Sequence, residues 1–285
     1  MNNIFVGATK AALAAAAIVA ATLCAAPAAL AKTTTSSNWA GYAVHHPGVS
    51  FRQVSGTWTQ PNATCVPGQS TYSAVWVGIG GYKPTSNALE QIGTEVDCNQ
   101  AGNTVLSAWY ELVPAPSRTI SFVVHPGDVL HASVTVVGHQ ATLELDNLTL
   151  HRTFRKQLYA PSIDVSSAEW IVEAPSECVS QFACQALPLA DFGSVGFDSA
   201  TATSTTGTTG SITDSRWWRT KIMLMPGAQR FIVARQTSDT AGTATPSTLQ
   251  DRGSQFGVTY GTEAVPNEQF VGTLQSRLRA AYVEH

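Results

Sequence analysis

Hydrophobic and polar residues alternate along most of the chain, which is the pattern of strands that bury one face. In residues 74–80, Val75, Val77 and Ile79 alternate with Ala, Trp and Gly. Further alternating segments cover residues 107–112, 120–124, 129–137 and 141–150, with turn residues between them. Long amphipathic helical patterns are almost absent. Many short strands at regular spacing predict an all-β fold, an antiparallel β-sandwich.

The two ends of the chain depart from this pattern. Lys10 precedes an Ala-rich apolar run at residues 11–23, and small residues at 29 and 31 fit a signal-peptidase site. We therefore expect residues 1–31 to be an export signal that is cleaved before Lys32, and the mature protein to be secreted. After Tyr260 the apolar spacing becomes helical, which predicts a short C-terminal helix built on Pro266, Phe270, Leu274, Leu278 and Tyr282. The sandwich domain is then residues 32–260, followed by an extension at 261–285.

Composition narrows the choice of partners. With 16 Lys and Arg against 19 Asp and Glu, the net charge is −3, which argues against nucleic-acid binding. Charged residues are only 12% of the chain, so self-repulsion in acid is limited and acid tolerance is plausible. Residues 201–210, rich in Thr and Gly, are predicted to form a low-complexity loop.

The cysteines predict disulfides rather than a metal site. Four of the five lie beyond the export signal, and an even number in a secreted chain indicates two disulfides. Three pairings are possible. We favour Cys65–Cys98 and Cys178–Cys184 because each closes a local loop. No CxxC pair or His cluster supports metal binding, so we expect no metal. We also expect no cofactor, no membrane contact after cleavage, and a monomer.

Several predicted strands carry a polar or aromatic face. Residues two apart in a strand share a face, at a spacing of about 6.6 Å. By this rule Trp76 shares its face with two glycines, Trp109 with Glu111, and Glu173 with Glu169. If these strands are neighbours in one sheet, they line a groove suited to an extended polymer, either a peptide or a glycan. The polar and aromatic residues of these faces are Trp76, Gln91, Glu95, Trp109, Glu111, Glu169 and Glu173.

Seven short motifs follow one another in order along the chain. They are Asn38-Trp39-Ala40-Gly41-Tyr42, Val54-Ser55-Gly56-Thr57-Trp58, Trp76-Val77-Gly78-Ile79, Gln91-Ile92-Gly93, Ala108-Trp109-Tyr110-Glu111, Ala168-Glu169-Trp170-Ile171-Val172-Glu173 and Phe256-Gly257-Val258-Thr259-Tyr260. This ordered set resembles the glutamic peptidases, or eqolisins. The resemblance implies a sandwich of two large antiparallel sheets, similar to legume-lectin jelly rolls. It also implies acid endoproteolysis by a Gln/Glu dyad, which falls on Gln91 and Glu173. We assign Trp76, Trp109, Tyr110, Glu111 and Glu95 to substrate binding, the substrates being polypeptides.

The chemistry of the two side chains suits those roles. A carboxylate such as Glu173 can deprotonate a water and later return the proton to the leaving amine. The amide of Gln91 does not titrate, but its NH₂ can donate to a developing oxyanion. Glu169 is the rival of Glu173. Four residues along a strand span about 13 Å, so only one of them can face Gln91; the resemblance selects Glu173.

Other readings stay open at this point. The chain has Gly80, Glu95 and Ala174-Pro175 where the fungal pattern differs, which leaves the pH optimum and subsite preferences undetermined. A glycoside hydrolase could use Glu173 with Glu111 or Glu95 as its two acids. A lectin-like module would need the aromatic groove alone. Asp-Thr-Gly, Asp-Ser-Gly, HExxH and GxSxG motifs are absent, which argues against the other hydrolase classes that use them.

Overall fold

The computed structural model of the protein describes residue 1 and residues 31–180, 183–229, 231 and 242–261. The predicted export signal and the predicted C-terminal helix lie outside these residues, apart from Met1 and Ala31. Within the described part, the only helical element is a short 3-10 helix, η1 (Asp251–Gly253). The strands are β1 (Ala31–Ser36), β2 (Trp39–His45), β3 (Phe51–Thr59), β4 (Ala74–Gly80), β5 (Leu89–Cys98), β6 (Thr104–Val113), β7 (Arg118–Ile120), β8 (Val129–Val137), β9 (Gln140–Asn147), β10 (Arg152–Tyr159), β11 (Ser167–Glu173), β12 (Ser176–Ser180), β13 (Ala183–Ala186), β14 (Ser194–Ser204), β15 (Thr209–Ser211), β16 (Trp218–Leu224), β17 (Thr243–Pro246) and β18 (Phe256–Gly261).

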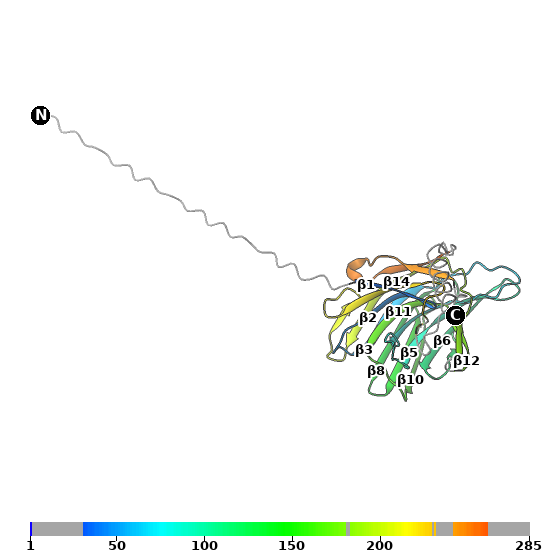
Figure 1. The fold of residues 1–285 in the computed structure, drawn as a ribbon, viewed down its shortest axis with the longest axis horizontal. Helices are drawn as coiled ribbons and strands as arrows, with labels where there is room; N and C mark the ends of the chain where they lie inside the picture. Colours follow the sequence, from blue (N-terminus) through cyan, green and yellow to red (C-terminus); the bar gives the residue numbers. More distant parts are fainter. Residues whose placement is uncertain (2–30, 181–182, 230, 232–241, 262–285) are drawn as a thin grey trace, which may run out of the picture.

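The strands form the predicted antiparallel sandwich. Hydrogen bonds connect them in the order β10-β9-β8-β3-β14-β18-β17-β16-β2-β11-β4-β5-β6-β7, so β17 and β18 join two halves of one continuous sheet. The halves lie face to face, since residues of β4, β5 and β11 contact residues of β3, β8, β9 and β14 (Figure 1). The exception to antiparallel pairing along this sheet is β1, which runs parallel to β16.

The main core fills the space between the two halves. It takes alternate residues from each strand, among them Val75, Val77, Trp170 and Val172 from β4 and β11. The facing half supplies the buried positions of β3, β8 and β9, whose burial alternates residue by residue. This period of two follows from the strand geometry, in which successive side chains point to opposite faces.

One predicted disulfide is confirmed. Cys65 and Cys98 are bonded and close a loop of sequence separation 33 that contains β4 and most of β5. Cys184 is also disulfide-bonded. The backbone of Cys178, its predicted partner, lies directly opposite Cys184 in the β12–β13 ladder.

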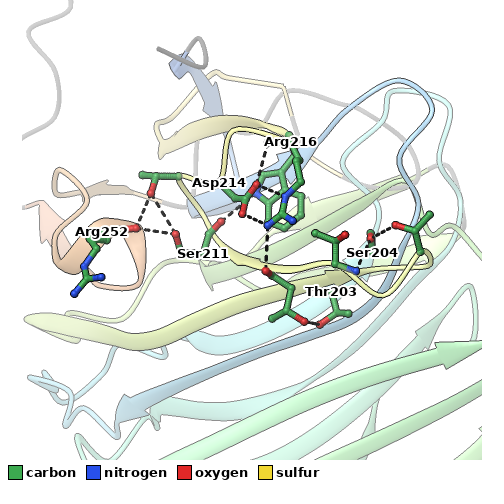
Figure 2. Close-up of polar contacts among 11 residues, drawn as sticks. Thr203, Ser204, Ser211, Asp214, Arg216 and Arg252 are labelled. Carbon is green, nitrogen blue, oxygen red and sulfur yellow. Dashed lines mark hydrogen bonds and ion pairs between the residues drawn. The ribbon is translucent and has the colours of Figure 1, made fainter. Parts of the chain in front are cut away.

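The predicted Thr- and Gly-rich loop at residues 201–210 is instead mostly a hairpin. β14 continues through Ser204 and β15 begins at Thr209, with Gly207 at a φ of 90° in the turn. β-Branched Thr residues favour strands, which the compositional reading overlooked. Figure 2 shows the polar network that holds this corner together: Arg216 binds Asp214 and the Thr209 carbonyl, and Ser211 donates to the Arg252 carbonyl.

Candidate active site

The four strands with predicted polar-aromatic faces are neighbours, in the order β11-β4-β5-β6. Trp76, Trp109 and Ile171 belong to a second hydrophobic cluster, separate from the main core. The side of the sheet that carries this cluster, together with Gln91 and Glu173, is called the dyad face below. The sequence thus predicted correctly which strands come together and which residues share this side.

The strand register places Gln91 in a row with two carboxyl groups. Gln91 lies opposite Gly78 on β4 and opposite Glu111 on β6, and Gly78 in turn lies opposite Glu169 on β11. The Gln91 amide donates from Nε2 to Glu111 Oε2 at 2.6 Å. A carboxamide NH₂ carries two hydrogens, and this bond uses one of them.

Two glycines make room for this arrangement. A Cβ added at Gly78 would lie 2.9 Å from the Trp76 ring and 3.2 Å from the Gln91 Cβ. A Cβ at Gly93, which lies between Trp76 and Trp109 in the next row, would lie 2.6 Å from the Trp76 Cβ and 2.2 Å from the Val75 carbonyl oxygen. Real Cβ atoms essentially never approach another heavy atom within 3.0 Å, so a side chain at Gly78 or Gly93 would displace its neighbours, Trp76 among them.

Glu173 lies at the end of β11, two rows away from Gln91, so by register Glu169 and not Glu173 is level with Gln91. Glu173 is opposite Ala74, which is opposite Glu95. Trp76 Nε1 donates to Glu173 Oε2 at 2.8 Å, and Asn38 Nδ2 donates to Glu173 Oε1 at 3.0 Å. Each carboxylate oxygen therefore accepts a hydrogen bond from a buried side chain.

Glu169 has a different environment from Glu173. It is fully buried, and in the part of the chain that the structure describes neither carboxyl oxygen has a hydrogen-bond partner. Burial raises the pKa of Glu169 well above its ordinary value; the nearby Ser167 hydroxyl opposes this shift, and Asp164 and Glu90 add to it. Glu169 is therefore protonated in acid, so it has no ionised carboxylate that could act as a base.

The dyad face is covered rather than open. Phe231 stacks on Trp39 and Tyr82, at centroid distances of 5.2 and 5.7 Å, and belongs to the same cluster as Trp76. On the same face the Gln91 side chain is 3% exposed and the Glu173 side chain is 9% exposed. The sequence predicted an exposed groove because it gave no indication that the chain after β16 returns across this face at Phe231.

The structure separates the other predicted substrate-binding residues. Glu95 lies on the dyad face and accepts a hydrogen bond from Ser107 Oγ at 2.6 Å; burial raises its pKa, and the Ser107 bond opposes the shift. Tyr110 does not lie there. It packs against the main core and stacks on Phe154, because it alternates with Trp109 and Glu111 along β6. This placement corrects its assignment to substrate binding.

Several buried polar atoms of this region have no partner among the described residues. They include Gln91 Oε1 and the indole nitrogens of Trp39 and Trp109. Buried polar atoms in proteins are nearly always hydrogen-bonded.

The described residues contain no group of three or more His, Cys, Asp or Glu side chains arranged to hold a metal. They also include no helix of the length and apolarity that a membrane crossing requires. The side chains of the dyad face described above carry carboxyl, amide and indole groups.

Comparison with known proteins identifies the relatives of this fold. Residues 37–248 match the Peptidase A4 family. The chain belongs to this family, the glutamic peptidases. This glutamic peptidase is 30% identical to aspergillopepsin-2 from Aspergillus niger over 199 residues, which are 61% of this chain and 67% of the relative.

Solved structures of glutamic peptidases share the fold. Scytalido-glutamic peptidase, solved with a peptide-based transition state analogue, matches with a TM-score of 0.61 and 26% identity, over 79% of this chain and 98% of its own. SCP-B, an eqolisin in complex with the tripeptide Ala-Ile-His, matches with a TM-score of 0.57 and 25% identity over the same shares of the two chains. Aspergilloglutamic peptidase from Aspergillus niger has a TM-score of 0.50, with 26% identity over 67% of this chain and 99% of its own. The protein is a glutamic-type endopeptidase, a conclusion that sets aside the glycoside-hydrolase and lectin alternatives.

Proposed function

We propose that the protein is a secreted acid endopeptidase that cleaves polypeptides with a dyad of Gln91 and Glu173. The observation that carries this proposal is the way the two groups are held. The Glu173 carboxylate is fixed through both oxygens, and the Gln91 amide is fixed by Glu111 through one N–H, while its second N–H has no acceptor among the described residues. Preorganised groups of this kind are what a hydrolytic site requires.

Glu173 acts as the general base in this proposal. Its ionised carboxylate takes a proton from a water, which attacks the carbonyl carbon of the scissile peptide. The C–O bond forms as the carbonyl becomes a tetrahedral oxyanion. Glu173 then returns the proton to the leaving nitrogen, and the C–N bond breaks to give an acid and an amine.

Gln91 stabilises the oxyanion. One N–H of its amide bonds Glu111, which holds the side chain in place, and the second N–H is available to the developing negative charge. Because an amide does not titrate, this donor works at any acidic pH. Removal of a single donor of this kind has cost about 10²–10³-fold in rate in other enzymes.

The environments of the two carboxyl groups on β11 support Glu173 over Glu169 as the base. Glu173 accepts hydrogen bonds from two N–H donors, which favour the charged form of a carboxylate. Glu169 has no such donor among the described residues, and its raised pKa keeps it neutral in acid. A neutral acid cannot accept the proton of a water.

The expected pH dependence follows from these assignments. Activity falls at low pH as Glu173 becomes protonated. The alkaline limb cannot come from Gln91, so it reflects a carboxyl that must stay protonated, such as Glu111 or Glu95, or a loss of structure. Because burial raises the pKa of Glu95, this residue can remain protonated above the ordinary range of a carboxyl. An optimum below pH 6 is expected.

The test is cleavage of casein between pH 2 and 8 by the wild type, Glu173→Gln and Glu169→Gln, with and without pepstatin. We expect the wild type to be active in acid and insensitive to pepstatin, which is built for two aspartates, and to chelators. Glu173→Gln should be inactive, while Glu169→Gln should keep the wild-type turnover number. If Glu169→Gln were inactive and Glu173→Gln active, the general base would be Glu169 and not Glu173. An optimum near pH 8 would reject an acid peptidase.

A further inference from the structure

Asn38, just before β2, has a buried side chain whose two polar atoms are both bonded. Its Oδ1 accepts from the Phe231 backbone N–H at 2.8 Å and from Ser36 Oγ at 2.9 Å. Its Nδ2 donates to the Phe231 carbonyl oxygen at 3.2 Å and to Glu173 Oε1 at 3.0 Å. The side chain therefore connects the chain before β2, the covering residue Phe231 and the carboxylate of Glu173.

The contacts with Phe231 fix which way the amide points. The backbone N–H of Phe231 can only donate, so it requires the amide oxygen, and its carbonyl can only accept, so it requires the NH₂ group. A rotated amide would place donor against donor and acceptor against acceptor. The second hydrogen of Nδ2 is thereby directed to Glu173.

We propose that Asn38 is a positioning residue that sets the orientation of the Glu173 carboxylate for catalysis. This inference rests on the proposed role of Glu173 as the base. Trp76 holds Oε2 from β4, and Asn38 holds Oε1 from the opposite side, since β2 pairs with β11 and places Trp39 opposite Glu173. With both oxygens held, the plane of the carboxylate is fixed relative to the attacking water.

Two substitutions separate positioning from simple structural support. Asn38→Ala removes the donor to Glu173. Asn38→Asp keeps the size and the acceptor for the Phe231 N–H, but it replaces the donor by a second carboxyl beside Glu173. Two carboxyls that share a site titrate as a coupled pair with one strongly raised pKa.

A matched control exists on the other half of the sandwich. Asn147 is also buried, and its Nδ2 donates to Asp128 Oδ2 at 2.7 Å. Asn147→Asp therefore creates the same kind of carboxyl pair on β9, away from the dyad face. It should lower stability without changing the pH dependence of catalysis.

The first measurement is independent of activity. The Trp76 indole N–H donates to Glu173, so its NMR chemical shift follows the ionisation of Glu173; its signal is assigned with Trp76→Phe. We expect the transition in Asn38→Asp to move to higher pH by about one unit or more, as for other paired carboxyls. In Asn147→Asp it should stay at the wild-type pH. A transition that does not move in Asn38→Asp overturns the inference, whether or not the protein proves to be a peptidase.

The second measurement is the kinetics of the folded variants, checked by thermal unfolding. Asn38→Ala should lower kcat by about 10–100-fold with little change in KM, because a misdirected base loses near-attack geometry. The acid limb of kcat/KM should move up in Asn38→Asp by the amount seen in the Trp76 signal. If Asn38→Ala does not fold, Asn38→Asp decides alone. Lowered stability with wild-type kcat and an unmoved acid limb would show that Asn38 is structural only.

Discussion

Two pairs of strands, β8 with β9 and β4 with β11, face the same core. They differ in the burial of the side that points away from it. In β8 and β9 nearly every second residue is at least partly exposed, and polar groups such as Glu144 reach solvent. In β4 and β11 every residue is buried, including Glu169 and Glu173. A polar side chain on a solvated strand face costs almost nothing, whereas a buried carboxyl loses its hydration.

The contrast separates a region of the sheet whose residues suit stability from a region whose residues suit catalysis. The outer side of β8 and β9 satisfies the ordinary rule of apolar in and polar out. The dyad face breaks that rule at several neighbouring strands at once, with acids and an amide where packing alone would select apolar residues. Sites where a fold violates its own pattern are the expected places for function.

The largest expected effect concerns a carboxyl on the core side of β5. Burial raises the pKa of Glu90 to about 8, with Asp164 adding to the shift. The unfolded chain titrates near 4.5. Folding therefore favours the protonated form of Glu90. The contribution of this residue to the free energy of unfolding is fully present below pH 4.5 and is lost as the pH rises from 4.5 to about 8. The loss is on the order of 3–5 kcal/mol.

Glu90→Gln keeps a neutral side chain at every pH. It should match the wild type at pH 4 and be clearly more stable at pH 8, measured by urea unfolding at pH 4, 6 and 8. Glu144→Gln on β9 is the control and should follow the wild type throughout. If Glu90→Gln also loses stability in parallel with the wild type, Glu90 is not the source of the pH dependence.

The next effect is on catalysis. Gln91→Ala should lower kcat by about 10²–10³-fold, because it removes the proposed oxyanion donor while the fold is kept. Gln140→Ala, at the exposed start of β9, should leave kcat unchanged. Steady-state cleavage of a peptide at acid pH measures both. Turnover above a few per cent of the wild type in Gln91→Ala would contradict the dyad.

The disulfide gives the third effect. Cys65–Cys98 closes the segment that carries Trp76 and Gln91, so the double variant Cys65→Ser and Cys98→Ser should lose about 2–4 kcal/mol and lose activity with it. Thermal unfolding and peptide cleavage, followed together as the temperature rises, test this. Full activity after a large fall in Tm would show that the dyad does not depend on this loop.

The smallest effect belongs to the solvated half. Arg155 and Glu144 form an ion pair at 2.8 Å on the exposed side of β10 and β9. Surface ion pairs contribute little, so Arg155→Ala should change the free energy of unfolding by less than about 1 kcal/mol. Urea unfolding at low and high salt checks it. A loss of several kcal/mol would mean that the two halves differ less than their burial indicates.

The alternation of residues predicted most of the fold because a period of two both makes a strand and assigns its faces. Residues 129–137 correspond to β8 and residues 74–80 to β4. The predicted strand at 120–124 is wrong: β7 covers Arg118–Ile120, and the following residues form irregular chain. Near 147 the predicted strand ends early, since Asn147 Oδ1 accepts from the Leu150 N–H and closes a turn.

The site was predictable by face but not by register. Period two placed Gln91 and Glu173 on one side, yet a strand pattern carries no information about which residues of neighbouring strands are level. The register puts Gln91 level with Glu169, which only the hydrogen-bonded pairs reveal. The contact of Asn38 with Phe231 joins residues 193 positions apart, and no local pattern announces it. Glu90 also gave no signal, because a carboxyl on a core-facing position resembles a solvated one in sequence.

The parallel pairing of β1 with β16 has a practical consequence for making the protein. β1 runs from Ala31 to Ser36, so it begins at the predicted processing site, and Ser36 Oγ bonds the Asn38 amide that holds Glu173. If the chain is cleaved before Lys32, as the sequence predicts, its new amino terminus lies in a strand paired with β16. A recombinant product that starts at Ser37 would lack β1 and the Ser36 hydroxyl that bonds the Asn38 side chain. An affinity tag fused upstream needs a flexible spacer before Lys32, and batches with ragged starts should differ in turnover as well as in mass.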